Sequence, residues 1–206
     1  LHYVGHIEAD GFECSDGRLD AHDLDFVGID AFFLNGCASY DQGMGLLENG
    51  AVGGVVTLTE VVNSGATRVG QAMVKLLNHG FPLHSALSVA GQQSFVGGQY
   101  SVVGDGDVDI AQRNDLGAPI TTVNTVDDGF LVSMCVYPTK DLSVGSMSGT
   151  VLDDSSKYCL TPGNLEEVHY TDPETLEKDL RAGGGLVSFK ENIYWPDELD
   201  LPRNEQ

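Results

Sequence analysis

The sequence predicts an α/β fold in its first half and a mainly β segment in its second half. Up to about residue 112, apolar runs alternate with segments that have the period of amphipathic helices. From residue 113 onward, short strand-like pieces follow one another, separated by Gly, Pro and Asp, with one helical segment among them. Of the 206 residues, 41% are hydrophobic, which is enough for a substantial core. We therefore expect an α/β core over residues 1–112 and a β-rich C-terminal extension of unassigned role over residues 113–206.

Apolar runs mark the strands of the first part. The expected strands are "LHYV", "VGIDAFFLNG" and "AVGGVVTLTEVV". Between the first two, "GFECSDGRLDA" predicts a hairpin with Asp16-Gly17 as its tight turn. Further along, "QYSVVGDGDVDIAQ" predicts a strand, a turn and a second strand.

Three segments of the first part have helical signals. "SYDQGMGLLENG" predicts a helix that closes at Asn49-Gly50, and "FPLHSALSVAGQQ" predicts one with Pro82 at its start. Between them, "GATRVGQAMVKLLNHG" follows a cap at Asn63 or Ser64. This helix is expected to bury one apolar face, made of Val69, Met73, Leu76 and Leu77.

The second part has a different texture. Its strand-like pieces are "ITTVNTV", "GFLVSMCVYP", "GTVLDD", "KYCLTPG" and "GGLVSFKENIYW". The segment "DPETLEKDLRAG" predicts one short helix among them.

The charge of the chain is strongly acidic, with 31 Asp and Glu against 10 Lys and Arg and a formal net charge of −21. The acidic residues are spread along a chain of globular hydrophobic content, which argues against a disordered acidic segment. The pattern is typical of a folded protein with a densely carboxylated surface, as in a high-salt cytoplasm. Because the chain has no basic stripe, we do not expect a nucleic acid as partner.

Several other classes of protein are disfavoured. No apolar run approaches the ~20 residues that a membrane-spanning helix needs, and the N-terminus does not have the pattern of a signal sequence. The cysteines at positions 14, 37, 135 and 159 match no zinc pattern, so we expect reduced thiols and no metal. The chain opens with Leu1 inside an apolar run, so we expect earlier elements of the domain to be missing from it.

The acidic surface predicts a fold that is weakly stable at low ionic strength, because salt screens the repulsion among carboxylates. The Debye length falls from about 10 Å at 0.1 M salt to about 3 Å at 1 M salt. We expect the melting temperature to rise with NaCl concentration over this range, as measured by thermal denaturation. A melting temperature that does not depend on salt would contradict this interpretation of the surface.

His6 and Cys37 occupy matching positions, each directly after an apolar run and a glycine in "HYVG-H" and "FFLNG-C". If both runs are parallel strands of one sheet, both side chains leave at its carboxyl edge, where open α/β sheets place their sites. A thiol and an imidazole are the pair that a cysteine nucleophile needs. The helix expected after Cys37 would direct its N-terminus at the sulfur and favour the thiolate, and the Cys37 N–H could stabilise an oxyanion. Taken singly, such a Cys is more often a buried hydrophobe, and such a His more often a loop residue.

The segment "LHYVGHIEADGFECSDGRLDAHDL…VGIDAFFLNGCASYDQG" resembles the CHAT family of caspase-like cysteine peptidases. Members have a strand ending in Gly-His, a hairpin-like linker, and a strand ending in a small residue and Cys. The resemblance continues through "GLLENGAVGGVVTLTEVVNSGATRVGQAMVKLLNHGFPLHSAL" to "YSVVGDGDVDI" and covers roughly residues 1–112. It implies a three-layer α/β/α sandwich, N-terminally truncated in this chain.

The resemblance also implies a peptidase that needs no cofactor and acts on a peptide or protein substrate. Cys37 would be the nucleophile and His6 the base, and the backbone N–H groups of Ile7 and Cys37 would bind the oxyanion. Ile7 stands where the family usually has Gly, and its bulk could crowd the substrate. The family's usual multidomain setting implies control by a sensor or partner element.

Charged residues near the sheet edge are candidates for the pocket that selects the residue before the scissile bond. Glu60 follows the third apolar run and Asp41 lies one turn beyond Cys37, so either carboxylate could select Arg or Lys. Arg68 and Arg18 are the nearest basic candidates for an acidic preference. On so acidic a chain, solvated surface positions are the favoured explanation of all four.

Three hypotheses therefore stand. The first is a caspase-like cysteine endopeptidase in the cytoplasm. The second is a catalytically inactive CHAT-like interaction module, which Ile7 and the missing first strands favour. The third is an unrelated flavodoxin-like binding domain in which Cys37 has no catalytic role.

Overall fold

A computed structural model of the chain describes residues 1–92, 97–111, 117–149, 152 and 157–203. It is a mixed α/β structure that divides into two compact units. Unit 1 contains Leu1–Leu77 and Pro82–Ile110, and unit 2 contains Asn78–Phe81 and Ala111–Gln206. Each unit has its own sheet and its own core, and each is described by itself below.

Unit 1 is built on a sheet with the strand order β1-β5-β6-β7. Its strands are β1 (His2–Val4), β5 (Ala31–Asn35), β6 (Gly53–Thr57) and β7 (Tyr100–Gly104). β1, β5 and β6 run parallel to one another, and β7 is antiparallel to β6. Every residue of β5 and β6 is buried, as expected for strands covered on both faces. The strands predicted from the apolar runs are confirmed, but no second strand follows β7 within residues 105–111.

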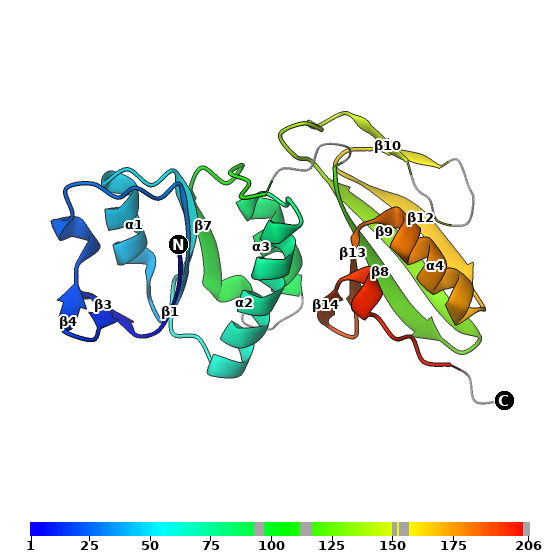
Figure 1. The fold of residues 1–206 in the computed structure, drawn as a ribbon, viewed down its shortest axis with the longest axis horizontal. Coiled ribbons are helices and arrows are strands. Elements are labelled where there is room, and N and C mark those ends of the chain that lie inside the picture. Colours follow the sequence, from blue (N-terminus) through cyan, green and yellow to red (C-terminus); the bar gives the residue numbers. More distant parts are fainter. Residues whose placement is uncertain (93–96, 112–116, 150–151, 153–156, 204–206) are drawn as a thin grey trace. The chain divides into compact units, whose positions relative to one another are not determined.

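Helices cover both faces of this sheet (Figure 1). α1 (Tyr40–Glu48) lies on one face, and α2 (Asn63–Asn78) and α3 (Leu83–Gln92) lie on the other. The predicted apolar face of α2 is confirmed, because its four residues are all buried. The predicted cap at Asn63 or Ser64 is wrong, because both residues already belong to the helix. The Ala66 N–H already donates to the Val62 carbonyl at 2.9 Å, so the helical hydrogen bonds begin before Asn63.

A small antiparallel sheet follows β1. It contains β2 (Ile7–Glu8), β3 (Gly11–Cys14) and β4 (Gly17–Leu19), and the short 3₁₀ helix η1 (Ala21–Asp23) comes next. The predicted hairpin is confirmed, but its turn is displaced by one residue. Cys14 pairs with Gly17, so Ser15 and Asp16 form the turn. Gly17 opens β4 at a φ of +139°, a conformation that a glycine adopts without strain.

Unit 2 is built on a mixed sheet with the strand order β12-β9-β8-β13-β14. Its strands are β8 (Ala118–Val126), β9 (Gly129–Tyr137), β12 (Gly163–Tyr170), β13 (Leu186–Phe189) and β14 (Asn192–Tyr194). β10 (Met147–Gly149) and β11 (Tyr158–Leu160) form a separate antiparallel ribbon, and α4 (Pro173–Gly183) follows β12. The predictions for β8, β9, β11, β13, β14 and α4 are confirmed, whereas β10 and β12 are not among the predicted strands. Most of the strand predicted at 149–154 lies outside the described residues.

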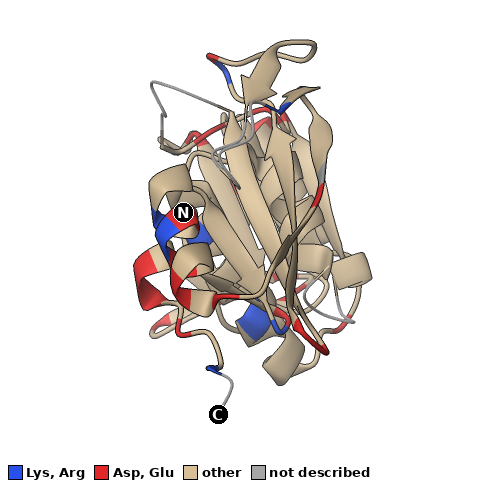
Figure 2. Ribbon diagram, turned by 90° about the vertical axis from the view of Figure 1, so that its right-hand side faces the viewer, with Lys and Arg blue, Asp and Glu red and all other residues tan. Residues whose placement is uncertain are grey.

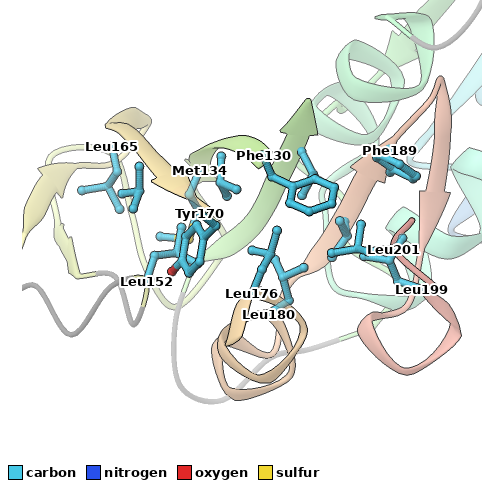
Figure 3. Close-up of a cluster of buried hydrophobic side chains, with 14 of the residues drawn as sticks. Phe130, Met134, Leu152, Leu165, Tyr170, Leu176, Leu180, Phe189, Leu199 and Leu201 are labelled. Carbon is cyan, nitrogen blue, oxygen red and sulfur yellow. The ribbon is translucent and has the colours of Figure 1, made fainter. Parts of the chain in front are cut away.

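The core of unit 2 lies between α4 and one face of its sheet (Figure 3). Leu176 and Leu180 of α4 pack with Phe130 of β9 and Phe189 of β13. The segment after β14 returns over this core and buries Leu199 and Leu201 in it. α4 itself begins at a side-chain cap, because the Asp172 carboxylate accepts a hydrogen bond from the Thr175 N–H at 2.9 Å.

In the ribbon of Figure 2, acidic residues are more widespread than basic ones and lie mostly on helices and loops, while most of the strands carry neither. Within the described residues, no helix is long and apolar enough to cross a membrane.

The core of unit 2 predicts a large cost for truncating α4. Leu176 is 0% exposed, so Leu176→Ala should lower the free energy of unfolding by about 2–5 kcal/mol, because lost burial adds to the cost of a cavity. Leu160→Ala is the matched control, because Leu160 is 62% exposed on β11 and its truncation should change stability by about 0.5 kcal/mol or less. Urea denaturation measures both. Equal losses in the two variants would contradict the packing of α4.

Candidate active site

The pairing of β1 with β5 brings the chain segments of His6 and Cys37 to one edge of the sheet. The register runs His2↔Phe33, Tyr3↔Leu34 and Val4↔Asn35, and the strands are parallel. The alignment continues one step further, because a Cβ atom added to Gly36 would lie 2.6 Å from the Gly5 carbonyl oxygen. His6 and Cys37 are the next residues of the two chains. The predicted parallel arrangement of these strands is therefore confirmed.

Cys37 lies in the turn between β5 and α1 and is partly buried. Its Sγ atom lies 4.0 Å from the Val61 carbonyl oxygen, a distance that allows a weak thiol hydrogen bond. Ala38, the next residue, has a φ of +47°, so the chain bends sharply after the cysteine. α1 starts at Tyr40, three residues past Cys37, so the helix predicted after the cysteine is confirmed.

Two buried hydroxyls hold this turn against β6, and we call Ser39 and Thr57 the hydroxyl clamp. The Thr57 Oγ1 donates to the Gly36 carbonyl and accepts from the Ser39 N–H at 3.1 Å. In return, the Ser39 Oγ accepts from the Thr57 N–H at 2.8 Å and donates to the Leu34 carbonyl at 3.2 Å. Both residues are 0% exposed, so these hydrogen bonds are shielded from water. The clamp fixes the backbone on both sides of Cys37.

His6 is exposed at the start of the small sheet, and its backbone is held more firmly than its side chain. Its carbonyl accepts hydrogen bonds from the Tyr3 hydroxyl at 2.9 Å and from the Glu13 N–H at 3.0 Å. Within the described residues, the imidazole makes no hydrogen bond or ion pair, and none joins it to the Cys37 thiol. Catalytic hydrogen bonds are often loose in ligand-free structures, so a free imidazole leaves the role of a base open.

Ile7 directs its side chain into the core. It is 5% exposed, and its Cγ1 and Cδ1 atoms lie 3.0 Å from the position that a Cβ atom on Gly36 would occupy. Its bulk therefore fills the space that the missing side chain of Gly36 leaves. The His6–Glu13 hydrogen bond makes the next pair, Ile7↔Phe12, a non-hydrogen-bonded one, so the Ile7 N–H points away from β3.

The carboxylates predicted for a substrate pocket have different surroundings. Glu60 is exposed in the loop after β6. Asp41 is exposed in the first turn of α1, and its carboxylate lies 3.5 Å from the Nε2 of His22 in η1. Desolvation lowers the pKa of His22, but its hydrogen bond to Glu48 and the charge of Asp41 outweigh this and raise that pKa. The side chain of Asp41 is therefore directed toward η1.

The two basic candidates lie on a strand of the small sheet and on α2. Arg18 on β4 forms an ion pair with Glu8 at 2.9 Å and another with Asp10, within the small sheet. Arg68 is exposed on α2. Among the residues that the structure describes, no group of three or more His, Cys, Asp or Glu side chains could hold a metal ion.

Sequence patterns alone do not predict the hydroxyl clamp or two further buried polar residues, Asn35 and Tyr100. The available signal was weak. Asn35 and Thr57 are polar residues at the last positions of strands that are otherwise apolar, which is where the side chains of an α/β sheet reach its carboxyl edge.

A scan against protein-family models finds no match to this chain, and a search of curated proteins finds none either.

The hydroxyl clamp predicts a specific cost for losing one hydroxyl. Thr57→Val keeps the shape of the side chain but leaves the Gly36 carbonyl and the Ser39 N–H without their partner, so the free energy of unfolding should fall by about 1–3 kcal/mol. Thr121→Val is the matched control, because Thr121 is 5% exposed and its side chain makes no hydrogen bond within the described residues. Urea denaturation should show a clearly smaller loss for it. If Thr121→Val lost as much free energy of unfolding as Thr57→Val, the hydrogen bonds of the clamp would not contribute to stability.

Proposed function

We propose that unit 1 is a caspase-like cysteine endopeptidase domain of the CHAT type that hydrolyses peptide bonds through His6 and Cys37. The observation that supports this most directly is the parallel pairing of β1 with β5, after which both residues leave at the same edge of the sheet. A three-layer α/β/α sandwich of the caspase type is the finer fold assignment that belongs to this proposal.

The chemistry follows from the two side chains and their backbone. His6 takes the thiol proton, and the Cys37 sulfur attacks the carbonyl carbon of the scissile bond. The N–H groups of Cys37 and Ile7 donate hydrogen bonds to the oxyanion of the tetrahedral intermediate. His6 then gives its proton to the leaving amine, and a water molecule activated by His6 hydrolyses the thioester. The N-terminus of α1 after Cys37 favours the negatively charged sulfur.

In this proposal, Glu60 is the better candidate for selecting Arg or Lys before the scissile bond. Its side chain is exposed in the loop whose Val61 carbonyl lies beside the Cys37 sulfur. Asp41 is less suited because its carboxylate is directed to His22. The substrate is a peptide or protein in a high-salt cytoplasm, and a regulatory protein or upstream domain controls access to the site.

One observation favours the second candidate, an inactive CHAT-like interaction module. The Cys37 thiol is directed to the Val61 carbonyl, and no hydrogen bond joins it to His6 within the described part of the chain. In such a module, Cys37 would be a partly buried thiol of ordinary reactivity.

A peptide-based thiol-reactive probe, applied in high salt, distinguishes the two candidates. If Cys37 is an activated nucleophile, the wild-type chain should be labelled and Cys37→Ala should not. His6→Ala should slow the labelling by roughly 10²–10⁴-fold, the usual contribution of a general base. Cleavage of a peptide mixture by the wild-type chain, followed by mass spectrometry, gives the second measurement and should be lost in both variants.

Cys14→Ala is the matched control, because Cys14 is an exposed thiol on the small sheet. This variant should be labelled at the same rate as the wild-type chain. Equal labelling of the wild-type chain and Cys37→Ala would rule out Cys37 as the nucleophile. Labelling that is slow and unaffected by His6→Ala, with no peptide cleaved, would favour the interaction module.

A further inference from the structure

A buried polar pair lies at the carboxyl end of β5, next to the turn that carries Cys37. The Tyr100 hydroxyl of β7 donates to the Asn35 Oδ1 at 2.6 Å. Tyr100 is 6% exposed and Asn35 is 7% exposed. A neutral hydrogen bond this short, shielded from water, holds both side chains in one geometry.

The pair is also tied to α2. The Asn35 Nδ2 donates to the Ala66 carbonyl of the helix at 3.0 Å. A Cβ atom on Gly70 would lie 3.0 Å from the same nitrogen, so the glycine on α2 leaves room for the amide. Three elements, β5, β7 and α2, are thus joined through one asparagine side chain.

Two links connect this pair to Cys37. Asn35 is the last residue of β5, separated from Cys37 only by Gly36. Tyr100 is the strand partner of Thr57, the residue of the hydroxyl clamp that binds the Gly36 carbonyl. Burial, together with the charge of Cys37, raises the pKa of Tyr100 to about 12, so its hydroxyl keeps its proton whenever a thiol ionises.

Although the pair joins β5, β7 and α2, stability alone does not require polar side chains at these positions. Replacing a buried polar pair by apolar groups of the same shape is often neutral for stability. A polar pair at such a position is better explained by a requirement of the neighbouring site.

We propose that Asn35 and Tyr100 are positioning residues for Cys37, which hold the end of β5 so that the Cys37 sulfur faces the carboxyl edge of the sheet. This inference rests on the proposed function. The pair acts through the backbone of Gly36 and does not touch the substrate. Neither an amide nor a protonated phenol is basic enough to accept the thiol proton, so His6 alone has the role of base.

The test measures the position of Cys37 without peptide cleavage. Iodoacetamide alkylates each cysteine of the intact chain in high salt at a series of pH values, and mass spectrometry gives the rate for each one separately. The exposed Cys14 is the reference thiol within the same molecule. In Tyr100→Phe, the rate at Cys37 relative to that at Cys14 should change by about three- to tenfold, which corresponds to the loss of one net hydrogen bond.

Tyr170→Phe is the matched control. Tyr170 is also 6% exposed, and its hydroxyl donates to the Asp179 carboxylate at 2.8 Å in unit 2. Tyr170→Phe should lower the melting temperature about as much as Tyr100→Phe does. It should leave the alkylation rate of Cys37 relative to that of Cys14 unchanged. The double variant Asn35→Leu with Tyr100→Phe leaves neither polar partner behind, so it should fold even if Tyr100→Phe does not, and it should show the same change at Cys37.

An unchanged pH profile and relative rate at Cys37 in folded Tyr100→Phe, or in the double variant, would overturn the positioning role. Failure of the proposed function has a different signature, because the wild-type chain would then cleave no peptide, or cleavage would persist in Cys37→Ala. If Tyr100→Phe retains the cleavage rate of the wild-type chain and Cys37→Ala does not, only the positioning role is wrong. A lower kcat with an unchanged KM for peptide cleavage by Tyr100→Phe would support the positioning role.

Discussion

The candidate site depends on one pairing, that of the short strand β1 with β5. Only three residue pairs form it, and the stacking of the His2 ring on Phe33, with centroids 4.9 Å apart, supports the register. In a strand, a slip of one residue turns every side chain to the other face. Such a slip would turn Tyr3 away from Phe12, against which its ring packs edge-on. The register of β1 therefore determines both where the small sheet attaches and which residue follows beside Cys37.

The turn at Cys37 has a second constraint, which is the cost of leaving buried polar groups unpaired. Such a group costs roughly 1–3 kcal/mol, so a turn placed next to a buried sheet needs partners for its carbonyls and N–H groups. Ser39 and Thr57 provide them, and the Ala38 N–H donates to the Thr59 carbonyl at 3.1 Å. The N-terminus of α1 has no side-chain cap, because the hydroxyl of Ser39 is used toward the strands. The turn is thus held by β5 and β6 more than by its own helix.

The sequence predicts these elements well where burial alone decides them. β5 and β6 are buried at every position, and α1 ends at Glu48, with Asn49 as its C-cap before Gly50, whose φ is +112°. The sequence does not predict β12, because its alternation of apolar and polar residues is interrupted. The interruption lies where the pairing of β12 with β9 shifts register, between Leu165 and Val168. Ser39, Thr57, Asn35 and Tyr100 could not be grouped from the sequence, because their hydrogen bonds join strands that are distant along the chain.

Ile7 illustrates why a departure from a family pattern has to be interpreted together with its neighbours. From the sequence alone, the bulk of an isoleucine in place of glycine next to His6 is expected to crowd the substrate. The side chain instead occupies the space above Gly36, where a Cβ atom would clash with the Gly5 carbonyl and with Ile7 itself. Gly36 and Ile7 are therefore complementary, and a glycine at position 7 would leave a cavity at the end of β5. The N–H of Ile7 points away from β3, so the hydrogen bonds between β2 and β3 do not use it.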